Sequence, residues 1–201
     1  MQKLYAYGDS WTWGAELKDR NKSWPHDLGK ILGMEVVNRG IPGNSNKNIS
    51  YSVVRDYYNN LLDNNLVVVM WTTPFRLGTP ARKETTMNNN FLLSTIAYEE
   101  EFDTEIFNRH LVTTETLASI HTATDILKDN KYIFTSAFHD YTNTNNDLAV
   151  SEHLQEISKS WLFPQGIVKA LPKKYERWAS TGKHPDEDGH RLMAHLLGSN
   201  I

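Results

Sequence analysis

The sequence contains no cysteine among its 201 residues. Disulfide bonds, thiolate metal sites and cysteine nucleophiles are therefore excluded. No apolar stretch approaches the ~20 residues that a membrane-spanning helix needs. The formal net charge is only -3 and the basic residues are scattered, the densest stretch being residues 173–177. We expect neither a nucleic-acid partner nor an acidic membrane partner, because both require a concentrated basic surface.

Cofactor signatures are also missing. The chain has no glycine-rich phosphate loop, no dinucleotide fingerprint, and no histidine pair at helical spacing with a nearby acid of the zinc-protease kind. We therefore expect no cofactor and no metal. No signal peptide is visible, since the first residues lead straight into a short apolar run. We expect a soluble protein of the cytoplasm in which it is made, unless it is carried in a larger particle.

What is present indicates a globular protein. Hydrophobic residues make up 39% and charged residues 22% of the chain, which is typical of a soluble domain with a buried core. A length of 201 residues fits one domain. We find no internal repeat and no linker, so we expect a single domain over residues 1–201, with a polar insertion around residues 74–102.

The apolar pattern alternates between short strands and longer helices. The unbroken apolar run over residues 66–71 is typical of a strand that is buried on both faces. Strands are expected at 4–7, 35–38, 66–71 and 132–138, and helices at 24–32, 48–62, 107–127 and 186–197. This alternation predicts a three-layer α/β/α sandwich with a mostly parallel central sheet. In such sheets ligands bind at the carboxyl ends of the strands.

The first polar motif is Gly8-Asp9-Ser10, directly after the first expected strand. A tight turn there can present the Ser10 hydroxyl at the edge of the sheet, and Gly8 permits such a turn. Because a serine hydroxyl is a weak nucleophile, it needs an adjacent base. By itself the tripeptide is equally consistent with a turn capped by Asp9.

The second motif is the glycine-containing loop over residues 38–46, after the second strand. A glycine lets the backbone approach a ligand closely and offer its N–H, as an oxyanion hole requires. The alternative is an ordinary loop before a helix, with Ser45 or Asn46 as N-cap.

The third motif is His184-Pro185-Asp186, just before the last expected helix. A histidine held on a loop can accept a serine proton and return it to the leaving group. Asp186 is interpreted as the cap of the helix that follows, and His190 as a residue that packs on it.

Together the three motifs, in this order, resemble the signature of the SGNH/GDSL hydrolases, which have a flavodoxin-like fold. The resemblance extends over essentially the whole chain. It implies Ser10 as nucleophile, His184 as general base, and the N–H groups of Ser10 and Gly43 as oxyanion donors. Longer segments, such as Gly-Asp-Ser-Trp-Thr-Trp-Gly-Ala-Glu-Leu, are similar to bacteriophage-encoded members, which implies the producing cell's cytoplasm or a virion as location.

Two positions depart from the family pattern. The family's oxyanion asparagine after the third strand is replaced by Trp71-Thr72-Thr73-Pro74, where the hydroxyl of Thr72 or Thr73 could donate instead. The family's aspartate three residues before the histidine is replaced by Thr181. Three outcomes stay open: a backbone carbonyl orients His184, a carboxylate such as Asp140 does so, or catalysis is inefficient.

Further candidates surround these motifs. Asp9 is interpreted as a structural hydrogen-bonding residue of the turn, and Asn44 as a supporting residue. Three tryptophans flank the proposed site and could stack on sugar rings: Trp11, Trp13 and Trp71.

We therefore expect a serine-dependent hydrolase of small acyl esters, such as O-acetyl groups on a carbohydrate, acting through an acyl-serine intermediate. The alternatives are a catalytically impaired carbohydrate-binding or virion-structural module, and an acyltransferase on the same scaffold. As partners we expect the carbohydrate ester substrate and either further copies of this chain or the other components of a virion.

Overall fold

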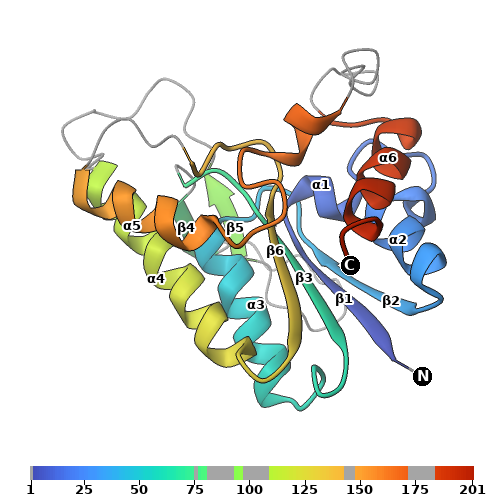
Figure 1. Cartoon of the computed structure of the whole chain (residues 1–201), viewed down its shortest axis with the longest axis horizontal. Helices are drawn as coiled ribbons and strands as arrows, with labels where there is room; N and C mark the ends of the chain where they lie inside the picture. Colours follow the sequence, from blue (N-terminus) through green and yellow to red (C-terminus); the bar gives the residue numbers. More distant parts are fainter. Residues whose placement is uncertain (1, 75–76, 81–92, 97–108, 143–147, 172–183) are drawn as a thin grey trace.

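The computed structural model describes residues 2–74, 77–80, 93–96, 109–142, 148–171 and 184–201. Its centre is a parallel sheet with the strand order β2-β1-β3-β6 (Figure 1). The strands are β1 (Lys3–Gly8), β2 (Glu35–Gly40), β3 (Leu66–Trp71) and β6 (Lys131–Ser136). Every pairing is parallel, as the alternating pattern predicts. All carboxyl ends therefore meet at one edge, where Gly8 pairs with Gly40 and Trp71 with Ser136.

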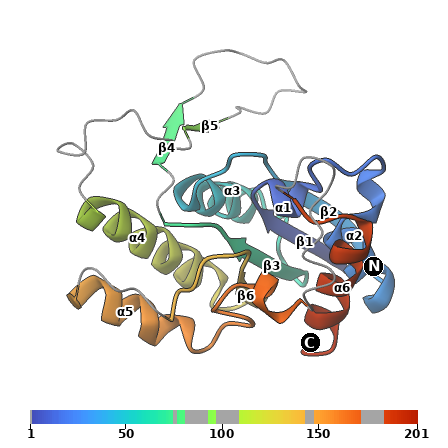
Figure 2. The same ribbon diagram turned by 90° about the horizontal axis from the view of Figure 1, so that it is seen from above.

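Helices cover both faces of this sheet (Figures 1 and 2). One layer holds α3 (Asn46–Tyr58), α4 (Arg109–Leu127) and α5 (Leu148–Ser158), and the other holds α2 (Trp24–Leu32) and α6 (Glu187–Gly198). Because successive strand residues point to opposite faces, Val67 and Val69 pack under the first layer, whereas Val68 and Met70 pack under the second. The predicted three-layer α/β/α sandwich is confirmed.

The ends of two helices follow the local chemistry of the sequence. Helix α2 ends at Leu32 because Gly33 adopts a left-handed conformation with φ of 66°. Helix α6 begins after Asp186, whose carboxylate accepts the Gly189 N–H at 2.9 Å, so the predicted cap is confirmed.

Other bounds differ from the expectation. Helix α3 ends at Tyr58 rather than at residue 62, and Asn60 follows with φ of 54°. The sequence pattern did not indicate α5. Within the insertion, β4 (Leu77–Pro80) and β5 (Leu93–Ile96) form an antiparallel pair. In the described ranges, no helix has the length and apolar character to span a membrane.

His190 lies on α6, contacts the start of α2 and is completely buried. Its Nδ1 accepts the Trp24 N–H at 3.2 Å, at the start of α2. Burial lowers its pKa to about 3, so the ring stays neutral in the folded protein at pH 5. The unfolded chain binds a proton there below its ordinary pKa of about 6.5. Stability therefore falls as the pH decreases from about 6.5 toward 3.

We expect His190 to lower the free energy of unfolding by about 2 kcal/mol at pH 5, since about 1.5 pH units separate that pH from the unfolded pKa. Other histidines with lowered pKa values, such as His139, contribute in the same direction, so the contribution of His190 is the difference between wild type and a His190 variant in urea unfolding at pH 7.5 and pH 5.0. The variant His190→Asn keeps an acceptor for the Trp24 N–H and removes the titrating ring. Its stability should depend less on pH by about the same amount. An identical pH dependence in both proteins would contradict the assignment.

Candidate active site

Ser10 follows β1 and opens α1 (Ser10–Trp13), a short helix at the carboxyl edge of the sheet. Asp9 is fully buried and holds this turn. One carboxylate oxygen accepts the Trp11 N–H at 3.0 Å, and the other accepts the Thr72 hydroxyl at 2.8 Å. Asp9 thus fixes the backbone of the nucleophile turn to the end of β3, in agreement with its predicted structural role.

The glycine-containing loop runs beside this turn. Asn44 donates from its side-chain amide to the Gly8 carbonyl at 3.3 Å, and Ser45 caps α3 by accepting the Asn48 N–H. Gly43 has φ of 75°, which a side chain would make costly. Within the described ranges, neither the Ser10 N–H nor the Gly43 N–H donates to another protein group. Toward the described part of the chain, the two amides predicted as oxyanion donors therefore keep their protons available.

The contacts of Thr72 do not support its predicted role as an oxyanion donor. Its hydroxyl donates to Asp9, and its N–H donates to the Asn46 side chain at 3.0 Å. Both of its protons are thus already engaged in a buried network. Asn46 also donates to the Tyr141 hydroxyl at 2.9 Å, and Tyr141 in turn donates to the Thr72 carbonyl. Thr73 is half-buried, and its role stays a prediction.

His184 lies immediately before α6, and its Nδ1 is 2.9 Å from a carboxylate oxygen of Glu16. The side chains are 19% and 22% exposed, so the contact is partly shielded from solvent. This contact orients the ring and leaves Nε2 as the nitrogen that can face a substrate or a nucleophile. Thr181, at the family's aspartate position, lies outside the described residues.

Asp140 is not the carboxylate that orients His184. Its oxygens accept from Thr142 and from the Lys169 ammonium at 2.7 Å. Burial raises the pKa of Asp140, but the hydrogen bonds from Lys169 and Thr142 outweigh that effect and hold it below its usual value. Asp140 therefore anchors its own loop.

The backbone after Ser10 turns so that Glu16 can reach His184. The N–H groups of Gly14 and Ala15 both donate to the Ser10 carbonyl, at 3.1 and 3.0 Å. Gly14 and Glu16 have φ of 80° and 68°, and this region is costly for a residue with a Cβ. Such strain at a non-glycine residue is often found at functional sites.

No sequence motif singles out Glu16. The local clue was present, since Glu16 is the one acidic residue in the segment that follows Ser10 over residues 11–18. Its contact with His184 spans 168 residues of sequence, and motif spacing does not encode such a contact.

The expected pair between Ser10 and His184 stays a prediction. Among the described residues, no hydrogen bond joins the Ser10 hydroxyl to the His184 ring. Catalytic hydrogen bonds often shorten only when substrate is bound. The Glu16 contact nevertheless holds His184 against the chain segment that begins at the candidate nucleophile.

The predicted tryptophan platform requires correction. Trp11 and Trp71 are 4% and 0% exposed and belong to the core, where they pack on Phe138 and Phe134. Their faces are therefore closed to a sugar ring. Trp13 is half-buried, and the Arg20 guanidinium covers it at 4.4 Å from the ring centroid. Only this third tryptophan keeps a partly accessible surface among the three.

A histidine also lies in the loop after β6. The His139 ring packs edge-to-face on Tyr141, with centroids 4.9 Å apart. Burial lowers the pKa of His139 to about 4, so the ring is neutral at pH 7. Through Tyr141, this loop is tied to the same network that holds Thr72 and Asp9.

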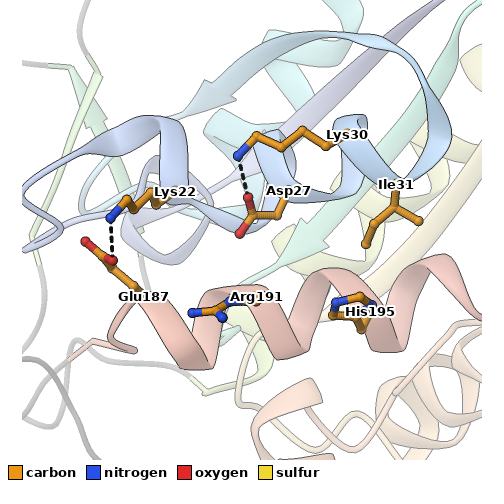
Figure 3. Close-up of a pocket in the computed structure, with 7 residues that line it drawn as sticks. All are labelled: Lys22, Asp27, Lys30, Ile31, Glu187, Arg191 and His195. Atoms are coloured by element: carbon orange, nitrogen blue, oxygen red, sulfur yellow. Dashed lines mark hydrogen bonds and ion pairs between the residues drawn. The ribbon is translucent and has the colours of Figure 1, made fainter.

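A separate groove of about 340 Å³ lies between α2 and α6 (Figure 3). Ion pairs of 2.7 Å join Lys22 to Glu187 and Lys30 to Asp27 on its walls. Neither Ser10 nor His184 lines this groove. Since these lysines already have acidic partners, the groove offers no clear charged site for a ligand.

Comparison with known proteins gives a likeness in structure only. No protein-family model matches the sequence, and no curated protein does. A lipase/acylhydrolase from Enterococcus faecalis matches with a TM-score of 0.60 at 13% identity, over 100% of this chain and 95% of that one. A lipolytic protein of the G-D-S-L family from Veillonella parvula matches with a TM-score of 0.56 at 16% identity, over 98% and 96% of the two chains.

An acetylxylan esterase from Geobacillus stearothermophilus matches with a TM-score of 0.53 at 16% identity, over 98% of this chain and 92% of that one. These likenesses cover nearly the full length of both chains, and the motifs at residues 8–10, 38–46 and 184–186 stand in the order of the hydrolase signature. The chain has the fold of the SGNH/GDSL hydrolases.

Proposed function

We propose that this protein is a serine-dependent esterase in which Ser10 is the nucleophile, His184 the general base and Glu16 the carboxylate that orients His184. The observation that carries the proposal is the 2.9 Å contact between His184 Nδ1 and Glu16. A histidine held in this way resembles the base of a serine hydrolase, because one ring nitrogen is fixed and the other is left to move a proton.

In the proposed mechanism, the Ser10 hydroxyl oxygen attacks the ester carbonyl while His184 Nε2 accepts its proton. The carbonyl oxygen becomes negatively charged and accepts hydrogen bonds from the Ser10 and Gly43 N–H groups. His184 then donates its proton to the leaving alcohol, which departs and leaves an acyl-serine. Water attacks this intermediate in a second round, with His184 again accepting and returning the proton.

The proposed mechanism uses two backbone donors. Thr72, which stands where the family has its third donor, cannot supply one because its hydroxyl already donates to Asp9. Losing one oxyanion donor costs about 3 kcal/mol, or roughly a hundredfold in rate. Unless the Thr73 hydroxyl donates as the sequence predicts, we therefore expect slower turnover of activated esters than in an enzyme with three donors.

For the substrate we propose a small acyl ester on a carbohydrate. The acetylxylan esterase with the same fold supports an acetyl group as the acyl part. The burial of Trp11 and Trp71 removes two of the three rings that the sequence predicts as sugar contacts. Trp13 is the one predicted sugar contact that remains.

The first experiment is intact-mass spectrometry after incubation with a fluorophosphonate that reacts with activated serines. We expect one adduct per chain on the wild type, on the peptide that contains Ser10, and no adduct on Ser10→Ala. If the folded wild type forms no adduct, Ser10 is not activated. That outcome would favour a carbohydrate-binding or structural module. Adduct formation followed by screening of acetylated sugars would define the acyl group and the alcohol.

A further inference from the structure

Two exposed histidines meet between α4 and α5, away from the candidate active site. His121 lies on α4 and His153 on α5, helices that run side by side in both views (Figures 1 and 2). Their Nε2 atoms are 2.8 Å apart, whereas their ring centroids are 5.0 Å apart. The two rings thus meet at their Nε2 atoms rather than face to face.

Such a contact has little value as a plain hydrogen bond. Both side chains are exposed, so water competes for each nitrogen. One ring must also be neutral to accept a proton from the other. The notable feature is that two separate helices hold two potential metal-ligand atoms close together.

The distance between the two nitrogens fits a metal chelate. Metal–nitrogen bonds of about 2.0–2.1 Å place two cis ligands about 2.9 Å apart at a right angle and about 3.3 Å apart at the tetrahedral angle. The observed 2.8 Å is close to the right-angle value, but the centroid distance of 5.0 Å means that the two Nε2 atoms point at each other. Both exposed rings must therefore turn until their lone pairs point to one metal ion. Because imidazole suits zinc, nickel and copper, whereas magnesium prefers oxygen, the pair selects for a late transition metal.

We propose that His121 and His153 form a surface site for a divalent transition-metal ion, which would join α4 to α5. No group of three or more histidine or acidic side chains gathers at one point in the described part of the chain. The site thus has two protein ligands, and water completes the coordination. With one ligand from each helix, the site would have a structural role, because a bound metal ion limits how far α4 and α5 can separate.

The test is a thermal melt of the untagged protein with and without ZnCl₂, at pH 7.5 in a buffer that does not chelate metal. At a zinc concentration ten times the apparent Kd, we expect Tm to rise by about 3–5 °C. EDTA should reverse the rise, and MgCl₂ should not produce it.

The variants His121→Ala and His153→Ala should each lose the zinc-dependent rise. His195→Ala, which removes an exposed histidine of α6, should keep it and serves as the control. Titration calorimetry should give one zinc ion per chain for the wild type and for Ser10→Ala, so the result does not depend on the proposed esterase activity. No rise in the wild type, or an equal rise in His121→Ala, would show that the pair is only a contact between two histidines.

Discussion

The His184→Ala variant should lose nearly all esterase activity, with kcat lower by roughly 10⁴–10⁶-fold. Without the imidazole, no group near Ser10 is expected to accept its proton, and the hydroxyl returns to its low intrinsic reactivity. The fluorophosphonate reaction should slow to a similar degree, because it depends on the same activated oxygen. Initial rates on an acetyl ester and the rate of adduct formation measure the two effects separately.

Stability has to be controlled in this experiment, because His184 also contacts Glu16 and precedes α6. We expect the variant to melt within a few degrees of the wild type, since the His184 side chain is partly exposed and contributes little to the core. His195→Ala provides the matched histidine replacement, and it should leave kcat unchanged. Activity of His184→Ala within tenfold of the wild type would overturn the assignment of His184 as the base.

The fold was largely predictable because its signal is local. The run over residues 66–71 is apolar throughout and forms a strand that is buried along its whole length. The end of α2 at Gly33 and the cap of α6 at Asp186 depend on neighbouring residues alone. The misplaced end of α3 has the opposite cause: Leu61 continues the apolar spacing, but the helix ends at Tyr58, the left-handed Asn60 follows, and Leu61 is exposed.

Sequence motifs mark only part of the candidate site. The segments of Ser10, Gly43 and His184 each contain a recognisable pattern of residues. The burial of Trp11 and Trp71 could not be predicted from the motifs, because an aromatic residue beside a motif can face either the core or the ligand. Thr72 was misjudged for a similar reason, since its partners Asp9 and Asn46 come from other loops.

The Glu16→Gln variant should lower kcat by roughly 10²–10⁴-fold with little change in KM. Glutamine has nearly the same shape, but it carries no charge and can donate to Nδ1, which would stabilise the unproductive tautomer of His184. The loss should therefore appear in the chemical step rather than in substrate binding. Steady-state kinetics on a soluble acetyl ester separate the two parameters.

Glu16→Asp distinguishes an orienting carboxylate from a residue that only supports the backbone. Its carboxylate is one methylene shorter, so we expect partial recovery of kcat over Glu16→Gln. Because aspartate adopts the left-handed backbone conformation of residue 16 more readily than glutamine does, the melting temperatures of the two variants should be compared alongside kcat. Glu187→Gln is the control for the loss of a negative charge. Glu187 lies on α6, where it is exposed and pairs with Lys22, and its replacement should leave kcat near that of the wild type. A kcat of Glu16→Gln within threefold of the wild type would mean that another acceptor orients His184. In that case the protein would work as a serine–histidine dyad, and the close contact with Glu16 would be structural.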